Sequence, residues 1–234
     1  GCLLCIHIPK RYLDEYTRYG HEREPQAWEP PTPEMARLRD LLRTRGNLVA
    51  TRTGLGLSLA DHAHPSKEAA TAHKRVLAAL DRQIARLEKA IQALITSDTI
   101  LEPLVTRCTS IIGVGLLTAA TVLAELGDLR RFKRSRQLSA FAGLNPSQKQ
   151  SGTSVRGKTK LSKAGSTRAR AVLFMAAKSA VLHDPAMTEL FDRLKARGKH
   201  SGSAYGAVMR KMLLLMRAVL ISEKDYTPKA LHQA

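Results

Sequence analysis

Hydroxyl and cationic side chains dominate residues 147–163, a stretch in which apolar residues nearly vanish. It carries the hydroxyls Ser147, Ser151, Thr153, Ser154, Thr159 and Ser162 and the cations Lys149, Arg156, Lys158, Lys160 and Lys163. Hydroxyls among guanidinium and ammonium groups are typical phosphate contacts. A hydroxyl there could also be a nucleophile, because nearby cations stabilise the charge that develops on an attacked phosphate. From residue types alone, phosphate binding is the favoured role for any single serine.

A second candidate site is Gly113-Val114-Gly115, between two apolar helical stretches. Glycine permits positive φ and close backbone approach. The turn would expose N–H groups at the start of the next helix, which includes Thr118 and ends at Gly127, and such a helix start attracts phosphate. This is the pattern of a helix-hairpin-helix element that binds nucleic-acid backbone without reading sequence. A tight turn between packed helices would also use these residues.

Basic residues beyond this turn favour the nucleic-acid interpretation. The candidate backbone contacts are Arg130, Arg131, Lys133, Arg134 and Arg168. Arg168 and Arg170 fall in or near the first turn of the helix expected after Ser166, where cations oppose the helix dipole. A bound phosphate would offset that cost.

The charge balance of the whole chain also indicates a polyanionic partner. Net charge is +18 and the pI about 10.3, and thirteen Lys or Arg but no acidic residue lie between Asp128 and Asp184. Nucleic acid is favoured over a membrane surface, because aromatic content is 4% and no apolar run reaches the roughly 18 residues of a membrane span. We therefore expect no membrane association and a cytoplasmic, nucleoid-associated location. The lone Cys2/Cys5 and His62/His64 pairs predict no metal site.

Hydrophobic periodicity predicts a mainly α fold. A helix is expected from Pro33 to about residue 50, broken by Gly54 and Gly56. Further helices are expected within 99–108, 118–126, 135–141, 166–182, 185–194 and 204–221. The Met-rich last helix is expected to be core. The domain division is a linker at 1–33, a helical coiled-coil region at 34–98, a helical domain with the hairpin and serine loop at 99–222, and a loose tail at 223–234.

Residues 77–94 form a heptad seam. Leu77, Ile84 and Ile91 occupy the a positions, and Leu80, Leu87 and Leu94 the d positions. β-branched residues at a with Leu at d favour two-stranded pairing between subunits. A helical hairpin with the 34–50 helix inside one chain would use the same seam equally well.

The order of motifs over 111–177 is similar to that of a known family. IxGVGxxTAAxxLAELGDLRRF, QLSAFAGLNPS, QSGxSxRGK and LSKAGSxRxRxxLFMAA follow one another. This order resembles the carboxy-terminal domain of transposases of the insertion-sequence "one-hundred-and-ten" class, which are guided by a bridge RNA. The WEPPTPE segment, the Arg-rich helix and the seam resemble the middle of those proteins, so the similarity covers roughly 18–222.

This resemblance implies DNA transposition or recombination. A serine in the basic loop would attack the DNA phosphodiester, and it maps onto Ser151, with Ser154 as second choice. An amino-terminal RuvC-like domain would hold Mg²⁺ through four acidic residues. DNA, a structured guide RNA and a homo-oligomer, dimer or tetramer, formed through residues 77–94 are the implied partners.

The amino-terminal segment departs from the family pattern. About 17 residues precede Arg18, and Asp14 and Glu15 are out of register with the acidic residues of the family. No metal ligand is therefore carried over to this chain, and no bound cofactor is expected in it. We expect an amino-terminally truncated transposase; a catalytically inactive nucleic-acid-binding module is the alternative.

Overall fold

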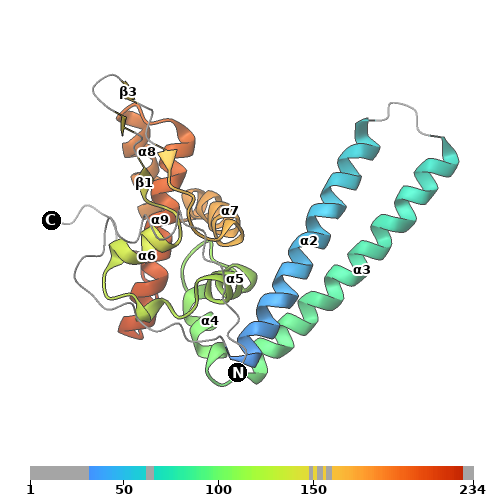
Figure 1. Cartoon of the computed structure of the whole chain (residues 1–234), viewed down its shortest axis with the longest axis horizontal. Helices are drawn as coiled ribbons and strands as arrows, with labels where there is room; N and C mark the ends of the chain where they lie inside the picture. The colour runs from blue at the N-terminus through green and yellow to red at the C-terminus, as the bar shows by residue number, and fades with distance from the viewer. Residues whose placement is uncertain (1–31, 62–65, 148–149, 152–154, 157–159, 229–234) are drawn as a thin grey trace. The chain divides into compact units, whose positions relative to one another are not determined.

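The computed structural model describes residues 32–61, 66–147, 150–151, 155–156 and 160–228. These residues are nearly all helical, which confirms the mainly α prediction. The helices are α2 (Pro33–Asp61), α3 (Lys67–Ser97), α4 (Leu101–Thr109), α5 (Leu116–Leu126), the short η1 (Leu129–Arg131), α6 (Ser135–Phe141), α7 (Thr167–His183), α8 (Pro185–Ala196) and α9 (Ser201–Ser222). Figure 1 traces them along the chain. In the described ranges, no helix is long and apolar enough to cross a membrane.

Helices α2 and α3 lie side by side as a hairpin (Figure 1). Ile91 of the heptad seam is fully buried, and Leu38 of α2 is fully buried as well. Ion pairs connect Arg45 to Glu88 (2.6 Å) and Arg52 to Asp81. The intramolecular alternative for the seam is therefore present within one chain. Subunit pairing through residues 77–94 stays a prediction.

The predicted break at Gly54 and Gly56 is wrong, because α2 runs through both glycines to Asp61. Each glycine costs a helix about 1 kcal/mol relative to alanine. Packing against α3 offsets this cost, since Leu55 and Leu59 continue the partly buried face of α2 beyond the glycines. Tertiary contact therefore overrides local propensity here.

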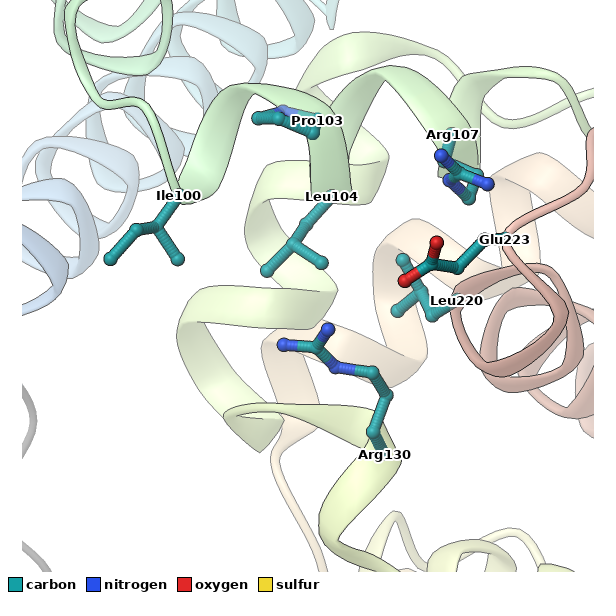
Figure 2. A pocket seen from close by; sticks show the side chains of 7 residues that line it. All are labelled: Ile100, Pro103, Leu104, Arg107, Arg130, Leu220 and Glu223. Atoms are coloured by element: carbon teal, nitrogen blue, oxygen red, sulfur yellow. The ribbon is translucent and has the colours of Figure 1, made fainter.

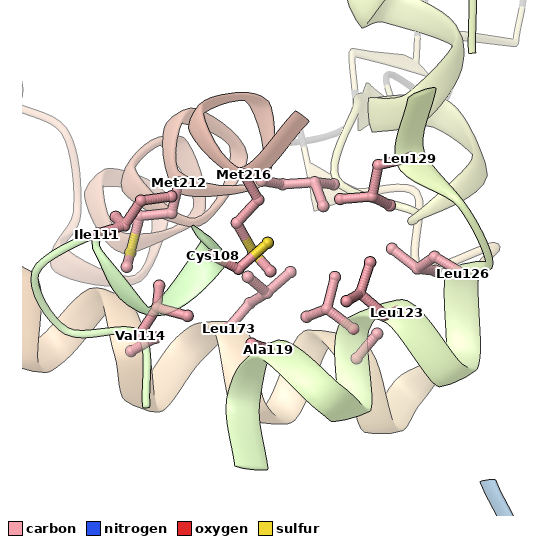
Figure 3. Close-up of a cluster of buried hydrophobic side chains, with 14 of the residues drawn as sticks. Cys108, Ile111, Val114, Ala119, Leu123, Leu126, Leu129, Leu173, Met212 and Met216 are labelled. Atoms are coloured by element: carbon pink, nitrogen blue, oxygen red, sulfur yellow. The ribbon is translucent and has the colours of Figure 1, made fainter. Parts of the chain in front are cut away.

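Helix α5 lies at the centre of the remaining core. Seven of its eleven residues are buried. Side chains from α4, the turn after it, α5, α7 and α9 meet there (Figure 3), among them Cys108, Val114, Leu123, Leu173 and Met212. Burial raises the pKa of the Cys108 thiol to about 12, so this cysteine is a packing residue and not a reactive one. Met212 and Met216 are fully buried, which confirms the Met-rich α9 as core.

The prediction of a loose tail from residue 223 is wrong as far as Tyr226. The Tyr226 backbone N–H donates to Ser110 Oγ (2.9 Å), and its hydroxyl donates to Asp184 Oδ2 (2.8 Å). Asp184 is completely buried, and its other oxygen accepts the N–H of Ala186 at the start of α8 (3.0 Å). A buried carboxylate needs such donors, which is why the tail packs back onto the domain.

Candidate nucleic-acid interface

The basic segment folds into a two-part antiparallel hairpin, where the sequence suggested an irregular loop. β1 (Pro146–Ser147) pairs with β4 (Lys160–Leu161), and β2 (Gln150–Ser151) pairs with β3 (Val155–Arg156). The register sets Ser151 opposite Val155 and Ser147 opposite Lys160. We call β2 the outer strand, because it belongs to the pair farther along the hairpin, and Ser151 is its last residue.

Two glycines fix the root of this hairpin, which is the place where residues 143–145 meet residues 162–165. Gly143 has φ +71°, and a Cβ there would lie 2.7 Å from the backbone nitrogens of Ala164 and Gly165. A Cβ on Gly165 would overlap the carbonyl oxygen of Phe141. Ser162 N–H donates to the Asn145 carbonyl (2.9 Å) and Lys163 N–H to the Gly143 carbonyl (3.1 Å). Backbone meets backbone at this root, and a larger residue would separate the two strands.

The root is also attached to the helical core. Leu161 lies against Gly206 of α9, where a Cβ would be 3.3 Å from a Leu161 methyl. Arg170 Nη1 donates to the carbonyls of Gly165 (2.6 Å) and Ala142 (3.4 Å). Arg170 in the first turn of α7 thus satisfies carbonyls at the hairpin root. Its position there is explained without a bound phosphate.

The predicted contacts of the hairpin divide into three groups. Ser151, Arg156 and Lys160 lie on its strands. Lys163 is exposed at the root with φ +57°, in the left-handed region. The predictions for Lys149, Ser154 and Lys158 lie outside the described residues. Arg168, on α7, is exposed and donates to Asn47 Oδ1 of α2 (3.2 Å).

The Gly113 turn is packed against α7. Gly113 has φ +91°, and a Cβ on it would lie 2.7 Å from the Ala176 carbonyl oxygen and 2.9 Å from the Ala180 nitrogen. Val114 is buried, and its N–H donates to the Ile111 carbonyl (2.9 Å). The tight-turn interpretation thus accounts for both residues, and Val114 is corrected to a core position. Gly115 has open space around it and starts α5 without a side-chain cap, and Thr118 lies partly buried in the first turn.

The four basic residues between α5 and α6 differ in the contacts that their side chains make. Arg130 forms a close ion pair with Asp128 (2.9 Å). Arg131 Nη2 donates to the Leu126 carbonyl (2.9 Å), and its guanidinium lies over the ring of Phe132 (4.9 Å). These two arginines are engaged within the fold. Lys133 and Arg134 are exposed on the segment that leads into α6.

The sequence interpretation missed a junction between α2, α5 and α7. The Glu125 side chain is only 7% exposed, and it accepts two hydrogen bonds from Arg43 (2.8 and 3.0 Å). Ser166 Oγ, which caps α7, also donates to Glu125 (3.0 Å). Hydrogen bonds from the Arg43 guanidinium, and more weakly from Ser166, lower the pKa of Glu125. A signal was available, because Glu125 is the one charged residue of α5.

Arg39 belongs to the same junction, since its Nε donates to the Ala124 carbonyl (2.6 Å). Arg39 and Arg43 together hold α2 against α5.

A cavity of about 290 Å³ opens between α4, η1 and the end of α9 (Figure 2). Its lining combines apolar and charged residues: Ile100, Pro103, Leu104, Arg107, Arg130, Leu220 and Glu223. Across the part of the chain that the structure describes, no three His, Cys, Asp or Glu side chains gather where they could hold a metal ion.

Residues 105–192, which include the Gly113 turn and the whole hairpin, match the sequence model of the family described as Transposase IS116/IS110/IS902. The chain is 34% identical over 144 residues to the "Insertion element IS110 uncharacterized 43.6 kDa protein" of Streptomyces coelicolor, an alignment that covers 62% of the chain and 34% of that relative. It is 26% identical to the "Pilin gene-inverting protein" of Moraxella bovis over 92% of the chain and 66% of the relative.

A shorter alignment has the highest identity of the three. The chain is 46% identical over 79 residues to the "Transposase for insertion sequence element IS1111A" of Coxiella burnetii, which covers 33% of the chain and 21% of the relative. The chain thus spans about one third of the Streptomyces protein and two thirds of the Moraxella protein. Residues 105–192 are thus similar to the IS116/IS110/IS902 transposase family, and the names of two of these relatives refer to insertion elements.

Proposed function

We propose that this chain is the DNA-acting part of a transposase that cuts and rejoins DNA strands, with Ser151 Oγ as the nucleophile. The names of the relatives, transposase and gene-inverting protein, support action on DNA. The observation that carries the proposal is the position of Ser151. It is the last residue of the outer strand of a hairpin whose root is locked into the core, in a stretch free of acidic residues.

The proposed chemistry conserves phosphodiester bonds. Ser151 Oγ loses its proton and forms a bond to phosphorus, the bond from phosphorus to one deoxyribose oxygen breaks, and that oxygen takes up a proton. A hydroxyl of another strand then attacks the phosphoserine and releases the serine. The surrounding cations would stabilise the negative charge on the attacked phosphate. One phosphodiester replaces another, so the exchange needs no external energy source.

The remaining parts of the proposal come from the resemblance described above. They are a structured guide RNA that selects the target by base pairing, pairing of subunits through residues 77–94, and Mg²⁺ held by a RuvC-like domain. The described residues do not bring together a set of ligands that suits such an ion. We therefore route no step of the chemistry in this chain through a metal.

The test is a search for a covalent protein–DNA adduct. The chain is incubated with Mg²⁺, a DNA that carries the element end and the matching RNA, and adducts that survive denaturing electrophoresis are counted. We expect an adduct that is lost in Ser151→Ala and kept in Ser147→Ala, a matched control on β1 of the same hairpin. Loss in Ser154→Ala instead would move the nucleophile to the second choice.

An adduct that survives Ser151→Ala would contradict our assignment of the nucleophile. Salt-sensitive DNA binding without any adduct would favour the second candidate, a non-catalytic nucleic-acid-binding module. The observation in favour of that candidate is the number of exposed cations, including Lys133, Arg134 and Lys163, which bind phosphate backbones whether or not a strand is cut.

A further inference from the structure

Phe141 is an aromatic residue that the fold leaves exposed. It is the last residue of α6, and 48% of it is accessible to solvent. Its carbonyl oxygen lies against Gly165, so it stands at the root of the hairpin that carries Ser151. Most large aromatic side chains contribute to a fold by burial. Because about half of Phe141 stays exposed, that half does not stabilise the fold by burial.

The ring of Phe141 is nevertheless held in place. Its centroid lies 5.3 Å from that of Phe132, at an interplanar angle of 48°. The Arg131 guanidinium lies over both rings, 4.9 Å from the centre of Phe132 and 5.3 Å from that of Phe141. Arg131 is itself fixed by the Leu126 carbonyl, and Arg217 donates two hydrogen bonds to the Phe132 carbonyl (2.9 and 2.6 Å). The ring is therefore preorganised as well as exposed.

The surface next to Phe141 is cationic. Lys133 and Arg134 are exposed on the segment that leads into α6, Arg136 is exposed in the first turn of α6, and Lys163 is exposed across the hairpin root. The sequence has no acidic residue between 129 and 183. Leu182, an exposed apolar residue at the end of α7, instead has the acidic Glu189 and Asp192 beside it. An exposed apolar ring beside cations is complementary to a nucleobase on its phosphate backbone.

We propose that Phe141 is a stacking platform for an unpaired base of the DNA strand bound by this domain. This inference rests on the proposed action on DNA and names the form of DNA that the site takes. A base inside a duplex has both faces covered by its neighbours, so it cannot stack on a protein side chain. A base that has left the helix exposes a face, and every base has one, so the contact is tolerant of sequence. The cations then hold the flanking phosphates.

The experiment compares two DNAs with the full chain. One is a plain duplex, and the other is the same duplex with a short unpaired segment that contains the fluorescent base 2-aminopurine. We expect wild type to quench the fluorophore and to bind the unpaired DNA more tightly than the duplex. Phe141→Leu should weaken binding to the unpaired DNA about tenfold and leave duplex binding unchanged, because it removes one stacked base. Phe141→Trp should keep both quenching and affinity.

Two controls separate stacking from damage to the fold. Leu182→Ala removes an exposed apolar side chain from the far end of α7 and should change neither affinity. In wild type, 5-iodouracil placed in the unpaired segment should photocrosslink to Phe141, a readout that needs no substitution. Equal losses for duplex and unpaired DNA, or no loss in Phe141→Leu, would overturn the proposal. A Phe141 effect confined to RNA would overturn the assignment to DNA. If wild type binds neither DNA, the proposed function itself fails.

Discussion

Gly113 is the residue at which two elements of the core come into backbone contact. Its φ of +91° and its distance to Ala176 and Ala180 both exclude a side chain. We predict that Gly113→Ala lowers the free energy of unfolding by about 2–4 kcal/mol, from a left-handed conformation plus steric overlap. Gly115→Ala, two residues away with open space around it, should cost less than about 1 kcal/mol. Urea unfolding followed by circular dichroism measures both, and equal costs would contradict the packing argument.

Tyr226 is a second single residue that stabilises the fold, through its hydroxyl. Tyr226→Phe leaves the buried Asp184 without one of its donors, so we predict a loss of about 1–3 kcal/mol in the free energy of unfolding near neutral pH. Burial, followed by the hydrogen bond to Asp184 and its charge, raises the pKa of the Tyr226 phenol. A raised pKa means that the stabilisation is complete below the unfolded-state value of about 10 and declines as the pH rises through the folded-state value.

The difference between wild type and Tyr226→Phe should therefore be smaller at about pH 11 than at about pH 8. Unfolding curves at both values test this. Tyr205→Phe is the control, because the ring of Tyr205 packs against Phe191 and is kept by the substitution. If the cost of Tyr226→Phe did not change with pH, the stabilisation would not come from the Tyr226 hydroxyl.

At the scale of elements, the junction at Glu125 holds α2 against α5 and the start of α7. Its carboxylate has a lowered pKa because of the Arg43 guanidinium, so its stabilisation is present above the unfolded-state pKa of about 4.3 and is lost as the pH falls through the folded value. We predict that Glu125→Gln costs about 1–3 kcal/mol at neutral pH, and that the cost shrinks in acid below about pH 4.

The matched control is Glu88→Gln, which removes a more exposed pair with Arg45 between α2 and α3. It should cost less than about 1 kcal/mol. Urea unfolding at neutral and acid pH distinguishes the two variants. Equal costs for both would show that Glu125 is an ordinary surface charge.

The elements were largely predictable from the sequence, and their partners were not. The helices expected after Ser166 and from residue 185 are α7 and α8, and Ser166 and Asp184 cap them. Heptad spacing found α3, because it reports which face of a helix is apolar. Neither signal reports what covers that face, or that Glu125 meets an arginine 82 residues earlier in the chain. The same limit explains Tyr226, whose partner Asp184 lies 42 residues away.

For the molecule as a whole, the excess of positive charge governs binding to DNA. We predict that affinity falls linearly on a logarithmic scale of salt concentration, because each neutralised phosphate releases counterions. Replacing Lys158, Lys160 and Lys163 with Gln should weaken binding and reduce the slope by about 2–3. Replacing three exposed lysines elsewhere, Lys199, Lys211 and Lys224, controls for net charge. Equal effects of the two sets, measured by fluorescence anisotropy, would move the interface away from the hairpin.

The candidate site was predictable in composition but not in geometry. The run of cations and hydroxyls marked residues 147–163, yet nothing in it indicated that Ser151 would end a short strand. The strand pairs are two residues long, too short for a pattern of alternation to reveal. The contacts of Arg130 and Arg131 within the fold were not predictable for a related reason, since a cation looks the same in sequence whether it faces a ligand or a group of its own fold.

The root of the hairpin has a consequence for how such domains diversify. Gly143 and Gly165 are held by backbone atoms, and the hydrogen bonds beside them also join backbone groups. The geometry of this junction is therefore set mainly by backbone groups, with Leu161 against Gly206 as a side-chain contact. We therefore expect changes of length at the outer end of this segment to leave the fold of the helical body unchanged.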